Sequence, residues 1–169
     1  MTIAPADREP ELEQVRSLIA GLTEWDRVES LRLGLDAGLL LDFYYGAGEP
    51  DLPGPFAPPG GQLLLATHDG SSAGCIGFKR LTPEICEVKH LFVRPELRGL
   101  GIARNLAERL LAEATAAGYR VMRLETTTFM GSALALYASL GFQEREPYYE
   151  IPEAFLPVTV FMERDLGPA

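Results

Sequence analysis

The segment Arg98–Arg104 has the residue types and the spacing of an anion-binding loop. Gly99 and Gly101 leave the backbone free to curve tightly and to approach a ligand closely. A helix is predicted to begin directly after them, and the first N–H groups of a helix have no partners within it and lie at the positive end of its dipole. Such an arrangement binds phosphate groups, and the two flanking arginines would add charge-assisted hydrogen bonds.

The loop does not match two common nucleotide-binding patterns. A dinucleotide-binding fingerprint needs a third glycine at position 104, where this chain has arginine. A Walker loop needs a lysine and a Ser or Thr directly after its last glycine, and these are absent. The pattern that remains is Arg98-x-x-Gly101-x-Ala103, which opens a helix after a strand ending in Val-Arg-Pro.

The elements that must position this loop alternate between strand and helix patterns. The predicted strands are Thr2–Ala4, Gln62–Thr67, Ala73–Leu81, Ile85–Val93, Tyr119–Thr128, Phe142–Tyr149 and Val158–Glu163. The predicted helices are one with the apolar stripe Leu12, Val15, Leu18, Ile19 and Leu22, then Asp36–Tyr44, a third from Ile102 to Gly118, and Ser132–Leu140. This order predicts an α/β (α+β) fold, with a mixed, mostly antiparallel sheet flanked by helices on both faces. The length suits one domain over residues 1–169.

Local signals set several expected boundaries. Asp7 is predicted to cap the first helix and Ser132 the last one. His68-Asp69-Gly70-Ser71 is a strong turn signal between two strands. Gly74 and Gly77 within the next strand indicate a bulge or a close approach of another backbone.

The segment Gly46–Gly61 contains five prolines, which exclude a regular helix or a central strand. It is short and carries apolar side chains, so a disordered tether is not expected. We expect an ordered loop held in place by Leu52 and Phe56.

The charge and composition of the chain exclude several classes of partner. The formal net charge is −9, and an acidic protein lacks the basic surface on which nucleic-acid binding relies. No apolar run approaches the roughly 20 residues of a membrane span. The first residues lack the charged-then-apolar order of a secretory signal. We therefore expect a cytoplasmic protein without nucleic-acid or membrane partners.

The two cysteines, Cys75 and Cys86, are expected to be reduced core residues, because disulfides are uncommon in chains without a secretory signal. His68 and His90 are the only histidines, and they do not combine with the cysteines in metal-ligand spacing. No metal is expected.

Three segments together resemble one known family. Arg98-x-x-Gly101-x-Ala103 resembles the acetyl-CoA signature of GNAT acyltransferases. Ile85–Val93 resembles the strand that precedes this signature, and Ala133–Phe142 resembles the family's A-L-Y-x-x-L-G-F helix and turn. On these grounds the chain is identified as a member of the GNAT superfamily. The run Leu52–Gly61 and Pro147-Tyr148-Tyr149 resemble a bacterial branch whose substrates are mostly unassigned.

The resemblance implies an acetyl-CoA-dependent N-acetyltransferase that acts by direct attack of a primary amine of a small molecule or peptide. The residues implied to hold the pyrophosphate are Arg98, Gly99, Leu100, Gly101, Ile102, Ala103 and Arg104. Leu91, Phe92 and Val93 match the strand end whose main chain pairs with the pantetheine arm, where that strand splays from its parallel neighbour. An N–H there would stabilise the oxyanion of the thioester carbonyl. Relatives often form homodimers.

Two residues are candidates for moving protons. Tyr137 matches the family tyrosine whose hydroxyl lies near the CoA sulfur, so it is the candidate general acid, and core packing is the alternative. Glu87 stands 98 − 87 = 11 residues before Arg98, where some members carry a glutamate base. Strand alternation is expected to place Glu87, Lys89, Leu91 and Val93 on one side and Val88, His90 and Phe92 on the other. Because Lys89 shares that side, an ion pair is the alternative role for Glu87.

Other side chains are weaker candidates for the acceptor site. His90 is an alternative base or a structural histidine, and Tyr148, Tyr149 and Glu125 could line the acceptor pocket. Met130 departs from the family pattern, because many relatives carry at this position an asparagine that contacts the pantetheine arm. A CoA-binding regulatory module without turnover, or a different nucleotide-binding α/β domain, would share several of these features, and the acceptor itself is not named by the sequence.

Overall fold

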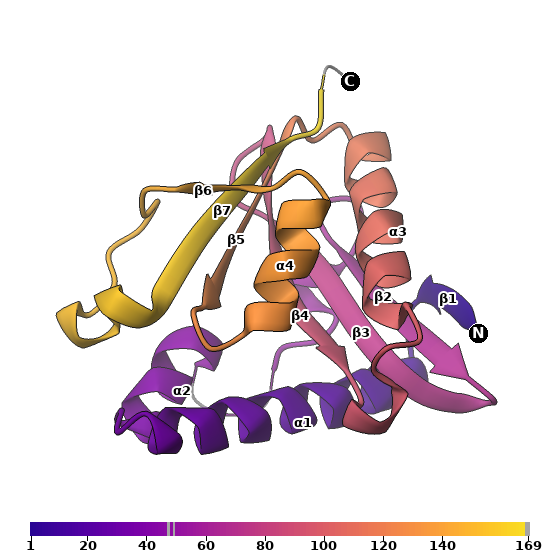
Figure 1. The fold of residues 1–169 in the computed structure, drawn as a ribbon. Helices are drawn as coiled ribbons and strands as arrows, with labels where there is room; N and C mark the ends of the chain where they lie inside the picture. The colour runs from indigo at the N-terminus through magenta and orange to yellow at the C-terminus, as the bar shows by residue number, and fades with distance from the viewer. Residues whose placement is uncertain (47, 49, 168–169) are drawn as a thin grey trace.

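The structure is a computed structural model that describes residues 1–46, 48 and 50–167. At its centre lies a seven-stranded sheet with the strand order β1-β2-β3-β4-β5-β7-β6 (Figure 1). Its strands are β1 (Thr2–Pro5), β2 (Gln62–His68), β3 (Ser71–Arg80), β4 (Ile85–Val93), β5 (Val121–Thr127), β6 (Gln143–Arg145) and β7 (Thr159–Asp165). Only β4 and β5 pair in parallel, so the prediction of a mixed, mostly antiparallel sheet is confirmed.

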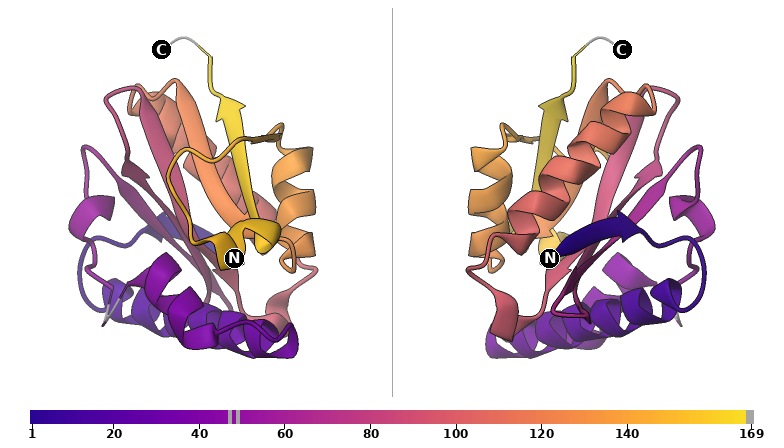
Figure 2. Two further views of the ribbon diagram at one scale, coloured as in Figure 1. Left: turned by 90° about the vertical axis from the view of Figure 1, so that its left-hand side faces the viewer. Right: turned by 90° about the vertical axis from the view of Figure 1, so that its right-hand side faces the viewer.

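Helices lie on both sides of the sheet, as predicted (Figure 2). The helices on one side are α1 (Glu11–Arg32) and α2 (Ala37–Tyr45), and those on the other are α3 (Ile102–Ala116) and α4 (Gly131–Ser139). The predicted apolar stripe of α1, Leu12, Val15, Leu18, Ile19 and Leu22, is buried against the sheet. Short 3₁₀ turns form at η1 (Gly54–Phe56), η2 (Pro95–Leu97) and η3 (Glu153–Val158).

Both predicted helix caps are wrong. Asp7 lies before α1, which begins only after Pro10, because the Ala6 N–H still donates to Leu63 of β2. The carboxylate of Glu9 accepts from the Glu13 N–H at 3.0 Å and thereby takes the capping role. Ser132 is the second residue of α4 and therefore cannot be its N-cap. The N-cap position is taken by Met130, whose N–H donates to the carbonyl oxygen of Thr127 in the turn before the helix.

The predicted strand Phe142–Tyr149 is much shorter in the structure, where β6 spans only Gln143–Arg145. Pro147 has no N–H to donate to a sheet, and the chain leaves the sheet there. This departure lets Tyr148 and Tyr149 pack their rings against Phe161 of β7, with ring centroids 5.0 and 5.1 Å away.

The other local expectations are confirmed. Asp69 and Gly70 both have positive φ, as a two-residue hairpin turn between β2 and β3 requires. Leu52 and Phe56 are buried and hold the proline-rich loop against the core, although Ala47 and Glu49 of that loop lie outside the described residues. At Gly74, a Cβ atom would lie 2.6 Å from the carbonyl oxygen of Phe92.

A β-bulge in β4 breaks the predicted alternation of its side chains. The register of β3 and β4 shifts between Cys75 and Gly77, and His90 opposite has a left-handed φ of 62°. Before the bulge the predicted alternation holds, and Val88 packs in the core on the α3 side of the sheet. After the bulge the two faces are exchanged, so that Val93 packs on the α3 side and Phe92 on the α1 side. Because successive side chains of a strand alternate between the two faces of the sheet, one inserted residue moves the side chains after it to the opposite faces.

The parallel pairing of β4 and β5 ends close to this bulge. Register partners run only from Ile85 and Val121 to Glu87 and Arg123, although both strands continue. The predicted splay of the two strands is thereby confirmed, and it opens the space in which the candidate site lies. No helix in the described part of the chain is long and apolar enough to cross a membrane.

Candidate active site

A cleft of about 500 Å³ lies beside the end of β4. Its lining brings together nearly all the predicted cofactor-binding residues, namely Leu91, Phe92, Val93, Arg98, Gly99, Gly101, Ile102, Ala103 and Arg104. The opposite wall comes from α1 and α4, through residues that include Trp25, Ser132 and Leu136. Leu100 is the exception among the predicted residues, since its side chain is 55% exposed and does not line the cleft.

The loop before α3 has the backbone conformation that its glycines permit. Gly99 and Gly101 have φ of 81° and 76°, in the left-handed region where a Cβ atom is strained. No side chain caps the first turn of α3, so its N–H groups are available to an anion. Together with the helix dipole, these N–H groups give the mouth of the cleft the properties that favour an anion, and the binding of a pyrophosphate there stays a prediction.

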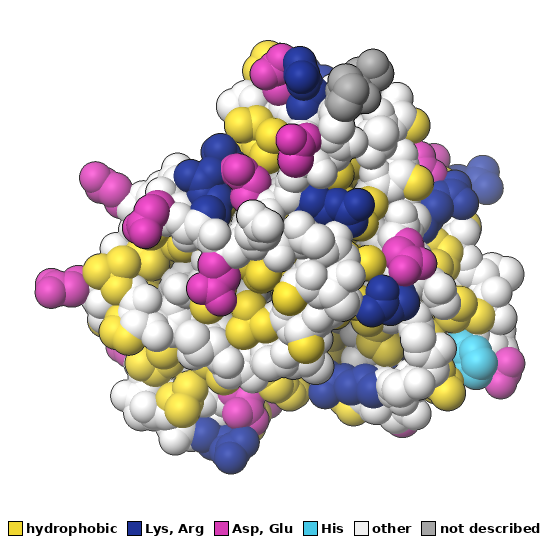
Figure 3. Space-filling model, turned by 45° about the horizontal axis from the view of Figure 1, so that its top comes forward, with side chains coloured by type: hydrophobic (Ala, Val, Ile, Leu, Met, Phe, Trp, Pro, Cys, Tyr) yellow, Lys and Arg dark blue, Asp and Glu magenta, His cyan; other side chains and the backbone are white. Residues whose placement is uncertain are grey.

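Arg98 and Arg104 lie at the edge of this cleft. The Nε atom of Arg98 lies 3.4 Å from the carbonyl oxygen of Val93, and an Nη atom of Arg104 donates to Ser139 of α4 at 2.7 Å. Both side chains are exposed, so each retains donors for a ligand. In the space-filling view, Lys and Arg side chains stand close to hollowed, apolar parts of this face (Figure 3).

A smaller cavity of about 80 Å³ adjoins the inner end of the cleft. Four residues line both spaces, and these are Leu22, Leu91, Met130 and Ala133. The polar side chains that line only the smaller cavity are Asp26, Tyr44, Tyr45, Lys89, His90, Glu125, Thr126, Thr127 and Tyr137. The larger cleft therefore adjoins a smaller cavity that is lined by polar and aromatic side chains.

Tyr137 reaches this smaller cavity from α4. Its side chain is buried, its ring packs edge-on against Phe142, and its hydroxyl makes no hydrogen bond within the described residues. Burial, and secondarily the charge of Glu125, raises the pKa of Tyr137 well above its usual range. The hydroxyl therefore keeps its proton at neutral pH and can donate it.

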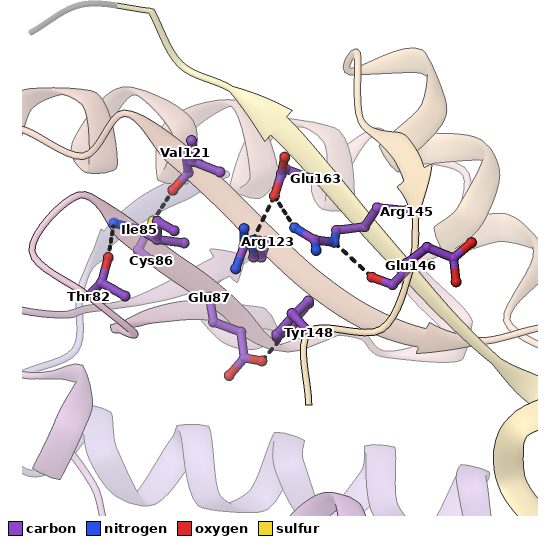
Figure 4. A network of polar contacts seen from close by, with 10 residues as sticks. All are labelled: Thr82, Ile85, Cys86, Glu87, Val121, Arg123, Arg145, Glu146, Tyr148 and Glu163. Atoms are coloured by element: carbon purple, nitrogen blue, oxygen red, sulfur yellow. Dashed lines mark hydrogen bonds and ion pairs between the residues drawn. The ribbon is translucent and has the colours of Figure 1, made fainter. Parts of the chain in front are cut away.

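Glu87 lies outside both spaces. Its buried carboxylate accepts a hydrogen bond from the Tyr148 hydroxyl at 2.7 Å (Figure 4) and lies 3.5 Å from the ammonium groups of Lys79 and Lys89. The ion pair with Lys89 that was the alternative role is thus present. The role of Glu87 as a base stays a prediction.

Glu125 on β5, which was a weaker candidate for the acceptor site, lies in the smaller cavity, whereas Glu87 does not. It lines the smaller cavity beside Tyr137 and pairs with Lys89, while its other oxygen, Oε2, is buried without a hydrogen-bond partner among the described residues. Burial raises the pKa of Glu125, and the charge of Lys89 opposes this. Sequence reasoning gave Glu125 only a minor place, because spacing alone does not show which side chains of two neighbouring strands reach the same cavity.

Asp26 and Tyr45 are site residues that sequence reasoning missed. Asp26 follows Leu22 by one helical turn, so a signal existed: a carboxylate on the apolar stripe of α1. Its side chain is buried, the Tyr45 hydroxyl donates to its Oδ2, and its Oδ1 has no partner among the described residues. Burial raises the pKa of Asp26 to about 6, and the hydrogen bond from Tyr45 opposes this.

The remaining candidates have structural surroundings. His90 stacks on Tyr45, and burial lowers its pKa to about 4, so it is neutral at physiological pH. Tyr148 lies between Arg123 and Arg145 and, like Tyr149, does not line the smaller cavity. The described residues contain no group of three or more His, Cys, Asp or Glu side chains placed to hold a metal ion.

Comparisons with known proteins identify the kind of site. Residues 31–142 match the acetyltransferase (GNAT) family model. An uncharacterised N-acetyltransferase of Schizosaccharomyces pombe is 35% identical over 114 residues, which are 66% of this chain and 68% of that protein. A putative acyl-CoA N-acyltransferase from Klebsiella pneumoniae has the same fold, with a TM-score of 0.73 at 24% identity over 98% of this chain and 97% of that one. An aminoglycoside 6′-N-acetyltransferase complexed with coenzyme A has a TM-score of 0.69 at 17% identity, over 100% and 99% of the two chains.

Proposed function

This chain belongs to the acetyltransferase (GNAT) family, and we propose that it transfers the acetyl group of acetyl-CoA to a primary amine of a small molecule or peptide. The observation that carries the proposal is the continuity of the two spaces. The larger cleft begins at a phosphate-binding loop, and the smaller cavity at its inner end contains a carboxylate and a protonated tyrosine.

The larger cleft has the features that acetyl-CoA requires. The segment 98–104 offers N–H groups, a helix dipole and two arginines to the pyrophosphate. The main chain of Leu91, Phe92 and Val93 does not pair with β5, and on this edge of β4 the pantetheine arm would pair instead. Bound acetyl-CoA would supply a thioester carbonyl, and an N–H of this strand end would stabilise its oxyanion.

We assign the two proton transfers of amide formation to two side chains of the smaller cavity. The amine nitrogen must lose a proton as it bonds to the thioester carbon, and Glu125 accepts that proton. The carbon–sulfur bond then breaks, and Tyr137 supplies a proton to the departing thiolate. We assign the base to Glu125 rather than Glu87, because the oxygens of Glu87 face Tyr148, Lys79 and Lys89.

The donor site is tested by retention on immobilised CoA. Arg98→Glu combined with Gly101→Asp removes a cation and fills the loop, so the double variant should elute with unretained protein. A matched control is Arg32→Glu with Gly34→Asp, which changes an exposed arginine and a positive-φ glycine at the far end of α1. Equal retention of both double variants would contradict the assignment of the loop.

The reaction is tested by a screen of amine acceptors in which free CoA thiol is measured. Release of thiol that depends on the acceptor is the expected result, at a pH where part of each amine is neutral. Tight CoA binding without acceptor-dependent thiol release would instead favour a CoA-binding module without turnover.

A further inference from the structure

Two buried carboxylates in the smaller cavity have one unsatisfied oxygen each. Asp26 on α1 and Glu125 on β5 are both less than a tenth exposed, and both line this cavity. Oδ1 of Asp26 and Oε2 of Glu125 have no hydrogen-bond partner among the described residues. Buried charged oxygens without partners are costly, so each indicates a group that binds there.

The charges around the cavity leave Asp26 without a counterion. Lys89 pairs with Glu125 and also approaches Glu87, which has Lys79 as a second cation. Asp26 forms no ion pair within the described residues, and its side chain is held only by the Tyr45 hydroxyl. One carboxylate thus remains without a compensating positive charge in this cavity.

The other titratable groups facing this space do not supply a positive charge. They are Tyr44, Tyr45, Tyr137, His90 and the Lys89–Glu125 pair. His90 is neutral. Burial, and secondarily the charges of both Asp26 and Glu125, raises the pKa values of Tyr44 and Tyr45, so the fields of the two carboxylates overlap. A cation that satisfies Asp26 must therefore come with the ligand.

The chemistry of amide formation separates the roles of the two carboxylates. The reacting nitrogen must be neutral to attack and ends as an uncharged amide, so it cannot neutralise a carboxylate throughout the reaction. Glu125, beside Tyr137, can take the proton that this nitrogen loses. Asp26 then faces a positive charge that persists through the reaction.

We propose that the acceptor is a compact dication, an amine that carries a second cationic group, and that Oδ1 of Asp26 binds this second group. The proposal rests on the proposed acetyl transfer and names the substrate class of the same site. Because the cavity holds only about 80 Å³, the two cationic groups belong on a short aliphatic chain.

Three probes of similar length test the charge of the far end: 1,4-diaminobutane, butylamine and 4-aminobutanoate. Each offers one primary amine to the thioester, and the other end is cationic, apolar or anionic. In the wild-type protein, kcat/KM for the diamine should exceed that for butylamine by about 10-fold or more, as one charge-assisted hydrogen bond predicts. The preference should lie mainly in KM, and 4-aminobutanoate should be the poorest acceptor.

Asp26→Asn should bring the ratio of kcat/KM for diamine and butylamine close to one, while Asp42→Asn should keep the wild-type ratio. Asp42 is a matched control because it is an exposed carboxylate on α2 that does not line the cavity. Tyr45→Phe serves as a second variant in case Asp26→Asn folds poorly. It keeps the carboxylate but removes the hydrogen bond that lowers the Asp26 pKa, so the diamine preference should weaken near pH 6 and return at higher pH.

The outcomes separate this inference from the proposed function. If no amine releases thiol although CoA binds, the proposed acetyl transfer fails and the inference fails with it. If amines are acetylated but the wild-type protein does not prefer the diamine, only the dication is overturned. A diamine preference that survives Asp26→Asn would equally overturn the role of Asp26.

Discussion

At the residue scale, burial acts in the same direction on Tyr137 and Glu125, the two side chains that we propose as acid and base. Burial disfavours the charged form of each group, so it raises both pKa values. For the carboxylate this makes a stronger proton acceptor, which suits a base. The phenol stays protonated at neutral pH, but its raised pKa makes it a weaker proton donor, which limits the help that it can give to a departing thiolate.

The identity of the base can be tested with two isosteric variants. Glu125→Gln should lower kcat by about 100-fold or more, the usual contribution of a general base. A carboxylate base is active when ionised, so wild-type kcat/KM should fall as the pH drops through the raised pKa of Glu125, and this acidic limb should vanish in the variant. Loss of the limb in Glu87→Gln but not in Glu125→Gln would return the base to Glu87.

Tyr137→Phe should lower kcat by about 100-fold at most, because a thiolate is a good leaving group and needs less help from an acid. The KM for acetyl-CoA should change little, since the hydroxyl lies in the smaller cavity. Steady-state kinetics in which acetyl-CoA and the amine are varied separately measures the change in kcat and the change in KM for acetyl-CoA. An equal loss in CoA binding would show that Tyr137 positions the cofactor instead.

At the element scale, the bulge in β4 connects the cofactor cleft to the acceptor cavity. The inserted residue turns Phe92 toward α1 and Val93 toward α3, while the end of β4 separates from β5. The bulge fits against β3 because Gly74 leaves room for the carbonyl oxygen of Phe92. A glycine on one strand therefore supports the site on the next one.

Gly74→Ala should destabilise the protein by about 2 kcal/mol, because its Cβ would meet a backbone oxygen at 2.6 Å that cannot move independently. Affinity for acetyl-CoA should also fall, since residues 91–93 must shift. Gly38→Ala is the matched control: it lies in α2, has no close neighbour beyond Asp36, and should gain up to about 1 kcal/mol from helix propensity. Urea unfolding and CoA titration check both variants, and a stable Gly74→Ala with full affinity would contradict this role.

The elements show where the sequence was sufficient and where it was not. Local spacing was sufficient for the stripe of α1, for the turn at Asp69-Gly70 and for the glycine loop that opens α3. The binding role of Arg98–Arg104 stays a prediction. The bulge at His90 depends on the fit between two strands, so simple alternation gave the wrong faces for Phe92 and Val93. The placement of α1 and β5 around one cavity is likewise not readable from local spacing, so no sequence pattern predicted that Asp26 and Glu125 line the same cavity.

At the scale of the whole molecule, the buried site affects the pH dependence of stability through two groups with opposite shifts. The pKa of Asp26 rises from 3.8 to about 6, and that of His90 falls from 6.5 to about 4. Between its two pKa values, Asp26 binds more protons in the native state than in the unfolded state. Between its own two values, His90 binds fewer protons in the native state. Stability therefore falls with rising pH because of Asp26 and rises because of His90.

Each effect amounts to about 3 kcal/mol at most, because one unit of pKa corresponds to about 1.4 kcal/mol, so the two nearly cancel between pH 4 and 6.5. Asp26→Asn should remove one of them and make the variant more stable than the wild type at pH 7, with a smaller gain at pH 4. His90→Asn, which suits the left-handed φ at this position, should gain stability relative to the wild type at pH 4. Urea unfolding of both variants at the two pH values measures these differences. Differences from the wild type that do not change with pH would show that neither group titrates as its burial predicts.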